Sequence, residues 1–188
     1  MVRFLQLLGY DIGSSSIKAS LVEAESGKLT ASVSFPLSEM PIISKKPGWA
    51  EQQPEMWYKN LVEATRLLKK NAGKKLKETA AIGISYQMHG LVLVDRSLKV
   101  LRPSIIWCDS RAVSYGERAR KKIGPKRCLE RLLNYPGNFT ASKLMWVIDN
   151  EPEIYGKAHK FMLPGEYIAM RLTGEIVTII PGLAEKIL

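Results

Sequence analysis

The sequence predicts an α/β fold, with a mixed β-sheet flanked by helices. Two kinds of segment alternate along the chain. Short segments are apolar or alternate between apolar and polar residues, as strands do, and longer segments have apolar residues at helical spacing. Such an order is typical of α/β folds, in which helices cover the faces of a sheet. The 188 residues are 46% hydrophobic, which indicates a globular chain with a sizeable core. We find no repeat, low-complexity tract or convincing internal domain boundary in the sequence.

The N-terminal part of the chain predicts three strands followed by a helix. Residues 4–11 and 16–23 lie on either side of a small-residue turn, which is typical of a β-hairpin, and residues 29–36 form a third strand. Pro54 suits the first position of a helix. The apolar residues that follow it keep helical spacing to about Lys70, and we expect this stripe in the core.

Shorter elements are expected in the middle of the chain. Residues 80–85 are a continuous apolar run, which predicts a buried strand. Residues 91–94 and 104–107 are expected as two further strands, and residues 95–99 as a hairpin turn after the first of them. From residue 111 to about residue 122 the pattern is helical.

The last part of the chain is expected to contain helices and one extended segment. Thr140 has the side chain of an N-cap, and the residues after it have helical spacing. The apolar face of this helix would consist of Leu144, Met145, Val147 and Ile148. The remaining elements are a short helix at 152–158, an extended segment at 160–163, and a helix at 165–172 that ends at Thr173 and Gly174.

The net charge of +10 at pH 7 comes largely from two clusters of cations. The first cluster consists of Arg66, Lys69, Lys70, Lys74, Lys75 and Lys77. The second consists of Arg118, Arg120, Lys121, Lys122, Lys126, Arg127 and Arg131. Nucleic-acid binding would need stacking aromatic residues or a groove-reading element beside such patches. Both clusters lie instead at or just after predicted helix ends, where cations suit the helix dipole, so we expect no nucleic-acid partner.

Apolar runs, the N-terminal segment and the cysteines indicate the cellular compartment of the protein. No apolar run approaches the roughly 20 residues that span a bilayer, so no membrane partner is expected. Residues 1–8 are too short for a signal peptide and lead straight into a strand. Cys108 and Cys128 are too few and too isolated for a disulfide framework or a zinc site. These features predict a cytoplasmic protein.

The run LGYDIGSSSIK (residues 8–18) contains the first candidate site. Asp11 ends a strand and is followed by Gly13 and by three serines, Ser14, Ser15 and Ser16. Glycine allows a ligand to approach closely, and serine hydroxyls and backbone N–H groups can wrap an anion. A carboxylate beside such a cradle suggests metal–nucleotide chemistry. An ordinary polar turn that faces water explains the same residues equally well.

Two further strand ends carry polar groups. Gln87 to His89 follow one predicted strand, and Asp109 follows another. Ligands of open α/β sheets gather at such loops, and together with Asp11 these groups would suit a hydroxylated substrate beside a metal-bound phosphate. His89 alone is more often a structural histidine, and His159 is placed in a helix–strand connection. The sequence contains no Walker A motif, which excludes a P-loop kinase. It also contains no Gly-x-Ser-x-Gly nucleophile elbow.

Motifs in a fixed order make the chain resemble the N-terminal half of the FGGY-family carbohydrate kinases. They are YDIGSSSIK at 10–18, PGWAEQQPEMW at 47–57, GISYQMHG at 83–90, IWCDSR at 106–111, GNFTASKL at 137–144, and MLPGEY with LTGE between 162 and 175. The resemblance runs from about residue 6 to about residue 178. Within the family, QMHG is similar to the xylulokinase branch, whereas glycerol kinases carry an Arg-Glu pair there.

The resemblance implies an actin-like/ribonuclease-H-like ATPase fold and phosphoryl transfer from ATP to a ketose such as D-xylulose. It implies that Asp11 holds Mg²⁺ through water. The residues that face the transferring phosphates would be Gly13, Ser14, Ser15 and Ser16, with Lys18 as a further candidate. The substrate-binding residues would be Met88, His89, Asp109 and Asn138, with Trp107 as a wall of the pocket.

The resemblance also implies a domain plan. Residues 1–178 would be the substrate-binding domain and residues 179–188 a truncated tail, without the second domain that supplies the catalytic aspartate and most of the adenosine pocket. No catalytic residue is therefore assigned in this chain, and we expect negligible kinase activity from it alone. An apolar face exposed where the second domain would pack favours a homo-oligomer. A non-catalytic sugar- or phosphate-binding module is the alternative.

Overall fold

The computed structural model describes residues 5–187, whose contacts form two compact units. The first unit comprises Met1–Pro41 and Glu55–Tyr86. The second comprises Ile42–Pro54 and Gln87–Leu188. Each unit has its own strands, helices and buried residues, so the candidate residues are divided between two frameworks.

The first unit is built on a four-stranded sheet in the order β3-β2-β1-β5. β1 (Gln6–Ile12), β2 (Ile17–Glu23) and β3 (Leu29–Phe35) are antiparallel neighbours, and β5 (Thr79–Tyr86) pairs with β1 in parallel. The hairpin, the third strand and the mixed character of the sheet are thus confirmed. The predicted hairpin start at residue 4 lies outside the described residues.

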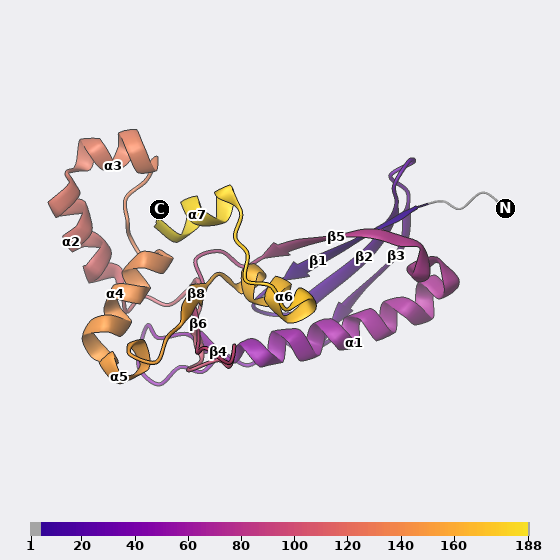
Figure 1. Cartoon of the computed structure of the whole chain (residues 1–188), viewed down its shortest axis with the longest axis horizontal. Coiled ribbons are helices and arrows are strands. Elements are labelled where there is room, and N and C mark those ends of the chain that lie inside the picture. The colour runs from indigo at the N-terminus through magenta and orange to yellow at the C-terminus, as the bar shows by residue number, and fades with distance from the viewer. Residues whose placement is uncertain (1–4, 188) are drawn as a thin grey trace. The chain divides into compact units, whose positions relative to one another are not determined.

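Helix α1 (Pro54–Ala72) runs along one face of this sheet (Figure 1). Alternate residues of β1, among them Leu8 and Ile12, are buried, and the Tyr10 hydroxyl lies 2.6 Å from Thr65 Oγ1 on the helix. The predicted apolar stripe of α1 is confirmed, since its members Trp57, Leu61, Ala64 and Leu68 are all buried. This packing leaves the other residues of β1, including Asp11, on the opposite face of the sheet.

β5 differs from the buried strand that the sequence predicts. The 3₁₀ helix η1 (Gly73–Glu78) leads into it, and within its sheet it is an edge strand that pairs with β1. Ile82 at its centre is 51% exposed. A continuous apolar run predicts a strand covered on both faces, but an edge position leaves much of β5 open. The homo-oligomer expected from an apolar face where a second domain would pack stays a prediction.

The second unit contains two short antiparallel strand pairs. β4 (Glu51–Gln52) pairs with β7 (Ser104–Ile105), and β6 (Val92–Val94) pairs with β8 (Lys160–Met162). A backbone hydrogen bond closes the predicted turn at residues 95–99, which is confirmed. The strands predicted in this part of the chain are present but shorter than expected.

Six helices complete the described part of the second unit. They are α2 (Val113–Ile123), α3 (Pro125–Leu132), α4 (Thr140–Asn150), α5 (Pro152–Tyr155), α6 (Pro164–Thr173) and α7 (Ile180–Ile187). The unit has a cluster of buried apolar residues that consists of Leu91, Leu93, Ile105, Ala112, Trp146 and Val147. Within residues 5–187, no helix is long and apolar enough to cross a membrane.

Two helices of this unit are absent from the sequence prediction. Half of the eight residues of α3 are charged and Cys128 alone is buried, so its apolar face is small. α7 lies in the segment 179–188, for which no helix is expected from the sequence. α6 ends as predicted, with Gly174 in the left-handed conformation.

The start and the buried face of α4 also differ from the prediction. Thr140 is the first helical residue, and Phe139 occupies the N-cap position without a side-chain cap. The buried side of the helix includes Lys143 and Trp146, whereas Met145 on the predicted apolar face is exposed. Val147 is buried and Leu144 packs against the buried cluster as predicted, so hydrophobic character alone identifies only part of the face.

Candidate functional site

The turn between β1 and β2 contains the predicted metal and phosphate residues. Asp11 lies opposite Lys18 in the strand register, and Lys18 Nζ is 3.3 Å from Asp11 Oδ2. Both side chains are substantially exposed to solvent. The Gly13 N–H donates to the Ser16 carbonyl at 3.1 Å, which closes the turn. A Cβ on Gly13 would lie 2.9 Å from that carbonyl oxygen, so any other residue would force the turn to shift.

The oxygen atoms of this turn suit Mg²⁺ and phosphate. Mg²⁺ usually keeps several waters and binds through one or two carboxylates and the phosphates of a substrate. Asp11 provides one solvent-accessible carboxylate, and the serine hydroxyls lie three to five residues further along. Residues 5–187 contain no group of three or more His, Cys, Asp or Glu side chains arranged to hold a metal. The turn therefore fits a Mg²⁺ ion held mainly by water and phosphate.

The segment Gln87–Gly90, here called the His89 corner, begins the longer part of the second unit. His89 has φ = 56°, which is in the left-handed region that residues other than glycine seldom adopt. Its backbone N–H donates to Glu185 Oε1 at 2.6 Å, and its carbonyl accepts from Lys143 Nζ at 2.6 Å. Charged side chains from two helices thus hold both peptide groups next to the His89 Cα.

The imidazole of His89 is half-buried. The centroid of its ring lies 4.1 Å from the centroid of the Phe139 ring, and the angle between the two ring planes is 35°. Burial lowers the pKa of His89, the charge of Lys143 lowers it further, and the hydrogen bond with Glu185 acts in the opposite direction. Nδ1 is buried and has no hydrogen-bond partner among the described residues. The lowered pKa keeps the imidazole neutral at physiological pH, so one of its nitrogens is a hydrogen-bond acceptor.

Other buried polar atoms near the corner also have no partner in the described chain. These atoms are Gln87 Nε2, Gln87 Oε1, Asn138 Oδ1 and Thr140 Oγ1. Gln87 is two positions from His89, and the other two residues flank Phe139, whose ring contacts the imidazole. Buried polar groups are almost always hydrogen-bonded in folded proteins. Donors and acceptors of this kind would suit a ligand rich in hydroxyl groups.

Lys143 of α4 is completely buried, with 0% of its surface exposed. Burial lowers the pKa of its amine from 10.5 to about 8. The charges of Asp109, Cys108 and Glu185 oppose this shift, and Arg111 adds to it. An amine in this position hydrogen-bonds most strongly to a peptide carbonyl when it is protonated, because the donor is then charged.

Asp109 is also fully buried, and its carboxylate is bound inside the protein. Oδ2 accepts from the Ala50 N–H at 2.6 Å and from Arg111 Nη2 at 2.7 Å. Oδ1 accepts from the Arg111 backbone N–H at 2.8 Å. These contacts fix the loop after β7 to the chain next to β4. A direct contact between Asp109 and substrate stays a prediction.

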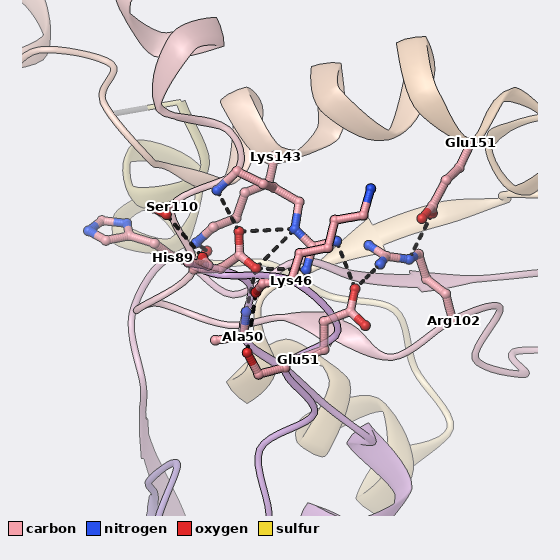
Figure 2. A network of polar contacts seen from close by, with 12 residues as sticks. Lys46, Ala50, Glu51, His89, Arg102, Ser110, Lys143 and Glu151 are labelled. Carbon is pink, nitrogen blue, oxygen red and sulfur yellow. Dashed lines mark hydrogen bonds and ion pairs between the residues drawn. The ribbon is translucent and has the colours of Figure 1, made fainter.

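The ion network continues away from Asp109 (Figure 2). Arg111 Nη1 lies 2.8 Å from Glu51 Oε1, and Arg102 bonds to the same oxygen. Arg102 Nε is 2.9 Å from Glu151 Oε2 on the far side. The Arg111 guanidinium is also stacked on Trp49, with Cζ 3.7 Å from the ring centroid. The network ties β4, the loop after β7 and the end of α4 together.

The predicted site residues fall into two sets. The first unit holds Asp11, Gly13, Ser14, Ser15, Ser16 and Lys18, which lie together in one turn. The second unit holds Met88, His89, Trp107, Asp109 and Asn138. Met88 is 58% exposed and Trp107 is 50% exposed, so each presents apolar surface to solvent. Their roles in binding stay predictions.

The sequence prediction missed Lys143 and Glu185, which hold the His89 corner. Lys143 lies three and four positions before the buried residues Trp146 and Val147, so a lysine on the buried stripe of a helix was the available signal. Glu185 contacts a residue 96 positions away, and nothing in its local sequence marks it.

Solved structures similar to this chain include sugar kinases. A xylulose kinase from Rhodospirillum rubrum matches with a TM-score of 0.87 and 30% identity, over 96% of this chain and 36% of its own. A structure described as a xyloylose kinase from Brucella ovis matches with a TM-score of 0.86 and 33% identity, over 96% of this chain and 37% of its own. The class is therefore that of the actin-like sugar kinases, as the motifs led us to expect.

The chain belongs to the FGGY family of carbohydrate kinases, whose N-terminal domain matches residues 6–184. It is 36% identical to a xylulose kinase of Klebsiella pneumoniae over 91% of this chain, and 37% identical to one of Bacillus subtilis over 92%. Each match covers 34% of the relative, so the chain spans about a third of the length of the curated relatives it matches.

Proposed function

We propose that this chain provides the sugar-binding part of an ATP-dependent ketose kinase of the xylulose kinase type. The observation that carries the proposal is the His89 corner, where buried polar atoms without partners in the described chain accompany a histidine held in the left-handed conformation. A ketose offers hydroxyl groups and a carbonyl, which pair with such donors and acceptors. The similarity to xylulose kinases supports a ketose as the substrate.

Met88, His89 and Asn138 are the proposed contacts of the sugar. His89 contributes Nδ1, and Asn138 contributes Oδ1, both of which are buried and unpartnered in the described chain. Asp109 is retained as a further candidate, and its bonds to Arg111 hold the loop that carries Trp107. Trp107 is proposed to wall the pocket. No residue of this chain is proposed as the catalytic base.

The β1–β2 turn is the proposed site of the transferring phosphates of ATP. Asp11 would hold Mg²⁺ through water, and the residues that would face phosphate oxygens are Gly13, Ser14, Ser15, Ser16 and Lys18. The ion, when bound, neutralises negative charge that accumulates on the phosphates. The chain itself contributes positioning, because the paired strands keep the Asp11 carboxylate and the Lys18 ammonium group next to each other.

The free cysteines fit the proposed cytoplasmic location. Cys108 is exposed and Cys128 is buried, and both are thiols rather than disulfide partners. Free thiols are typical of proteins in reducing compartments. The proposed small-molecule partner is the ketose.

A calorimetric titration with D-xylulose tests the proposal. We expect the wild-type chain to bind, and His89→Ala to bind at least about tenfold more weakly, because a buried hydrogen-bonding partner of the sugar is lost. His159→Ala is the matched control, since His159 is exposed and should leave the affinity unchanged. Binding that is absent in the wild type, or equal in His89→Ala, would overturn the proposal. Negligible ketose-dependent ADP release is expected from the chain alone.

A further inference from the structure

The His89 corner is held in place by contacts that involve its backbone rather than its side chain. His89 has φ = 56°, a conformation that side chains with a Cβ adopt at a cost. Such a residue keeps this conformation only where its surroundings over-determine it. Because position 89 is a histidine and not a glycine, neighbouring groups must impose this conformation on it.

Two charged side chains meet this residue from different helices. Lys143 Nζ on α4 donates to the His89 carbonyl at 2.6 Å (Figure 2). Glu185 Oε1 on α7 accepts from the His89 N–H at 2.6 Å. Hydrogen bonds with charged partners are the stronger ones, and these two act on the peptide groups on both sides of one Cα. Together they fix the peptide planes and thus φ and ψ of His89.

Gly90, which follows His89, restricts the position of the backbone at the His89 corner. A Cβ on Gly90 would lie 2.5 Å from Cγ of Pro164, at the start of α6. The chain therefore cannot move toward α6, and the ring of Phe139 lies against the imidazole of His89. The direction in which the imidazole points is consequently set by the peptide conformation that Lys143 and Glu185 maintain.

We propose that Lys143 and Glu185 are positioning residues, which clamp the His89 peptide in the left-handed conformation and so aim the imidazole at the substrate. The substrate part of this inference rests on the proposed function. Neither residue needs to touch the sugar. Lys143 is too deeply buried for a role at the surface, and its bond to a main-chain carbonyl accounts for an amine inside the protein.

A mutant cycle separates a backbone clamp from simple packing or charge. Lys143→Met, which keeps the length of the side chain, is combined with wild-type His89, with His89→Ala and with His89→Gly. Urea midpoints are measured at pH 7.5, where the imidazole is neutral. We expect Lys143→Met to change the midpoint similarly with histidine and alanine at position 89, and less than half as much with glycine. Glycine needs no clamp because it adopts positive φ freely.

Equal changes in all three backgrounds would show that Lys143 acts by packing or charge, and would overturn the clamp. If Lys143→Met does not fold by circular dichroism, the same cycle is run from α7. Glu185→Ala removes the acceptor and should behave like Lys143→Met, whereas Glu185→Gln retains a neutral acceptor oxygen and should change the midpoint less than Glu185→Ala. A Glu185→Gln midpoint equal to that of Glu185→Ala would count against the clamp.

Ligand binding tests the positioning role. We expect Lys143→Met to weaken D-xylulose binding by roughly tenfold or more, because misplaced contacts lose most of their value. Lys157→Met, at an exposed lysine of the same unit, should leave affinity unchanged. Unchanged affinity in Lys143→Met would overturn the positioning role. A wild-type chain without ketose affinity would refute the proposed function and this substrate role, while the mutant cycle would still decide the clamp.

Discussion

The Asp11 turn and the His89 corner are both candidate sites, and they are built in different ways. The Asp11 turn is closed by a bond between Gly13 and Ser16, and its ion pair with Lys18 is exposed to water. The His89 corner is closed by Lys143 and Glu185, which lie 54 and 96 positions away. The first site thus depends on local sequence and the second on tertiary structure.

The difference has a physical basis in the ligands that each site is proposed to bind. Phosphate groups are large, highly charged and tolerant of small shifts, so a glycine turn with nearby hydroxyls can serve them. A sugar is neutral, and it is distinguished by the placement of individual hydroxyl groups. Such discrimination requires donors and acceptors held by a rigid surrounding structure, which the buried network of the second unit provides.

The largest difference between the two regions is expected from removing a cation. Arg111→Met leaves Asp109 and Glu51 as buried carboxylates with a lost partner, and should lower the free energy of unfolding by about 3–5 kcal/mol. Lys18→Met breaks the exposed pair with Asp11 and should cost about 0–1 kcal/mol. Urea unfolding followed by circular dichroism compares the two variants. Similar losses would mean that the buried network contributes no more than a surface ion pair.

The buried amine of Lys143 should make the stability of the second unit depend on pH. The folded pKa of Lys143 is about 8 and its ordinary value is 10.5, so the folded state binds fewer protons between these values. The free energy of unfolding should therefore rise with pH across this interval, by up to about 3 kcal/mol from this group. The contribution is obtained as the difference between the wild type and Lys143→Met in urea unfolding at several pH values from 7.5 to 10.5. A difference that does not vary with pH would contradict the lowered pKa.

The smallest expected effects come from added methyl groups. In Gly90→Ala the new Cβ meets the rigid ring of Pro164, and we expect a loss of about 1–3 kcal/mol. In Gly13→Ala the new Cβ meets a carbonyl in a solvent-exposed turn that can adjust, so the loss should be smaller. Gly83→Ala is the control, with nothing within 4 Å of the added atom, and should stay within about 0.5 kcal/mol of the wild type. Thermal unfolding can rank the three variants, and a loss in Gly83→Ala as large as that in Gly90→Ala would contradict the steric explanation.

The parts of the fold that could be predicted from the sequence are those with a regular pattern on one covered face. Buried and exposed residues alternate along β1 and β2, and α1 has its buried residues at helical spacing. The sequence was therefore enough to predict that these elements are strands and a helix, and approximately where they end. β5 was correctly expected as a strand but not as an edge strand, because the position of a strand in its sheet is decided by pairing with distant residues. α3 was not predicted because it is short and half of its residues are charged, with Cys128 as its single buried residue.

The candidate site shows the same division. The Asp11 turn could be found from a carboxylate, a glycine and adjacent hydroxyl groups, since all of them belong to one hairpin. At the His89 corner the sequence indicated the histidine but not the groups that hold it. Asp109 was expected at a strand end but lies four residues after β7, and its partners Ala50 and Arg111 could be identified only in the folded chain.

The short helix α7 has a consequence for the dynamics of this chain. Its eight residues are fewer than an isolated helix needs to be stable in water, so its stability depends on contacts with the rest of the unit. Two of these contacts come from neighbouring residues, since Glu185 bonds to His89 and Lys186 pairs with Glu166 at 2.8 Å. Local unfolding of α7 would break both at once. The free energy that keeps this helix closed therefore also sets the fraction of the time in which the Glu185 bond to His89 is made.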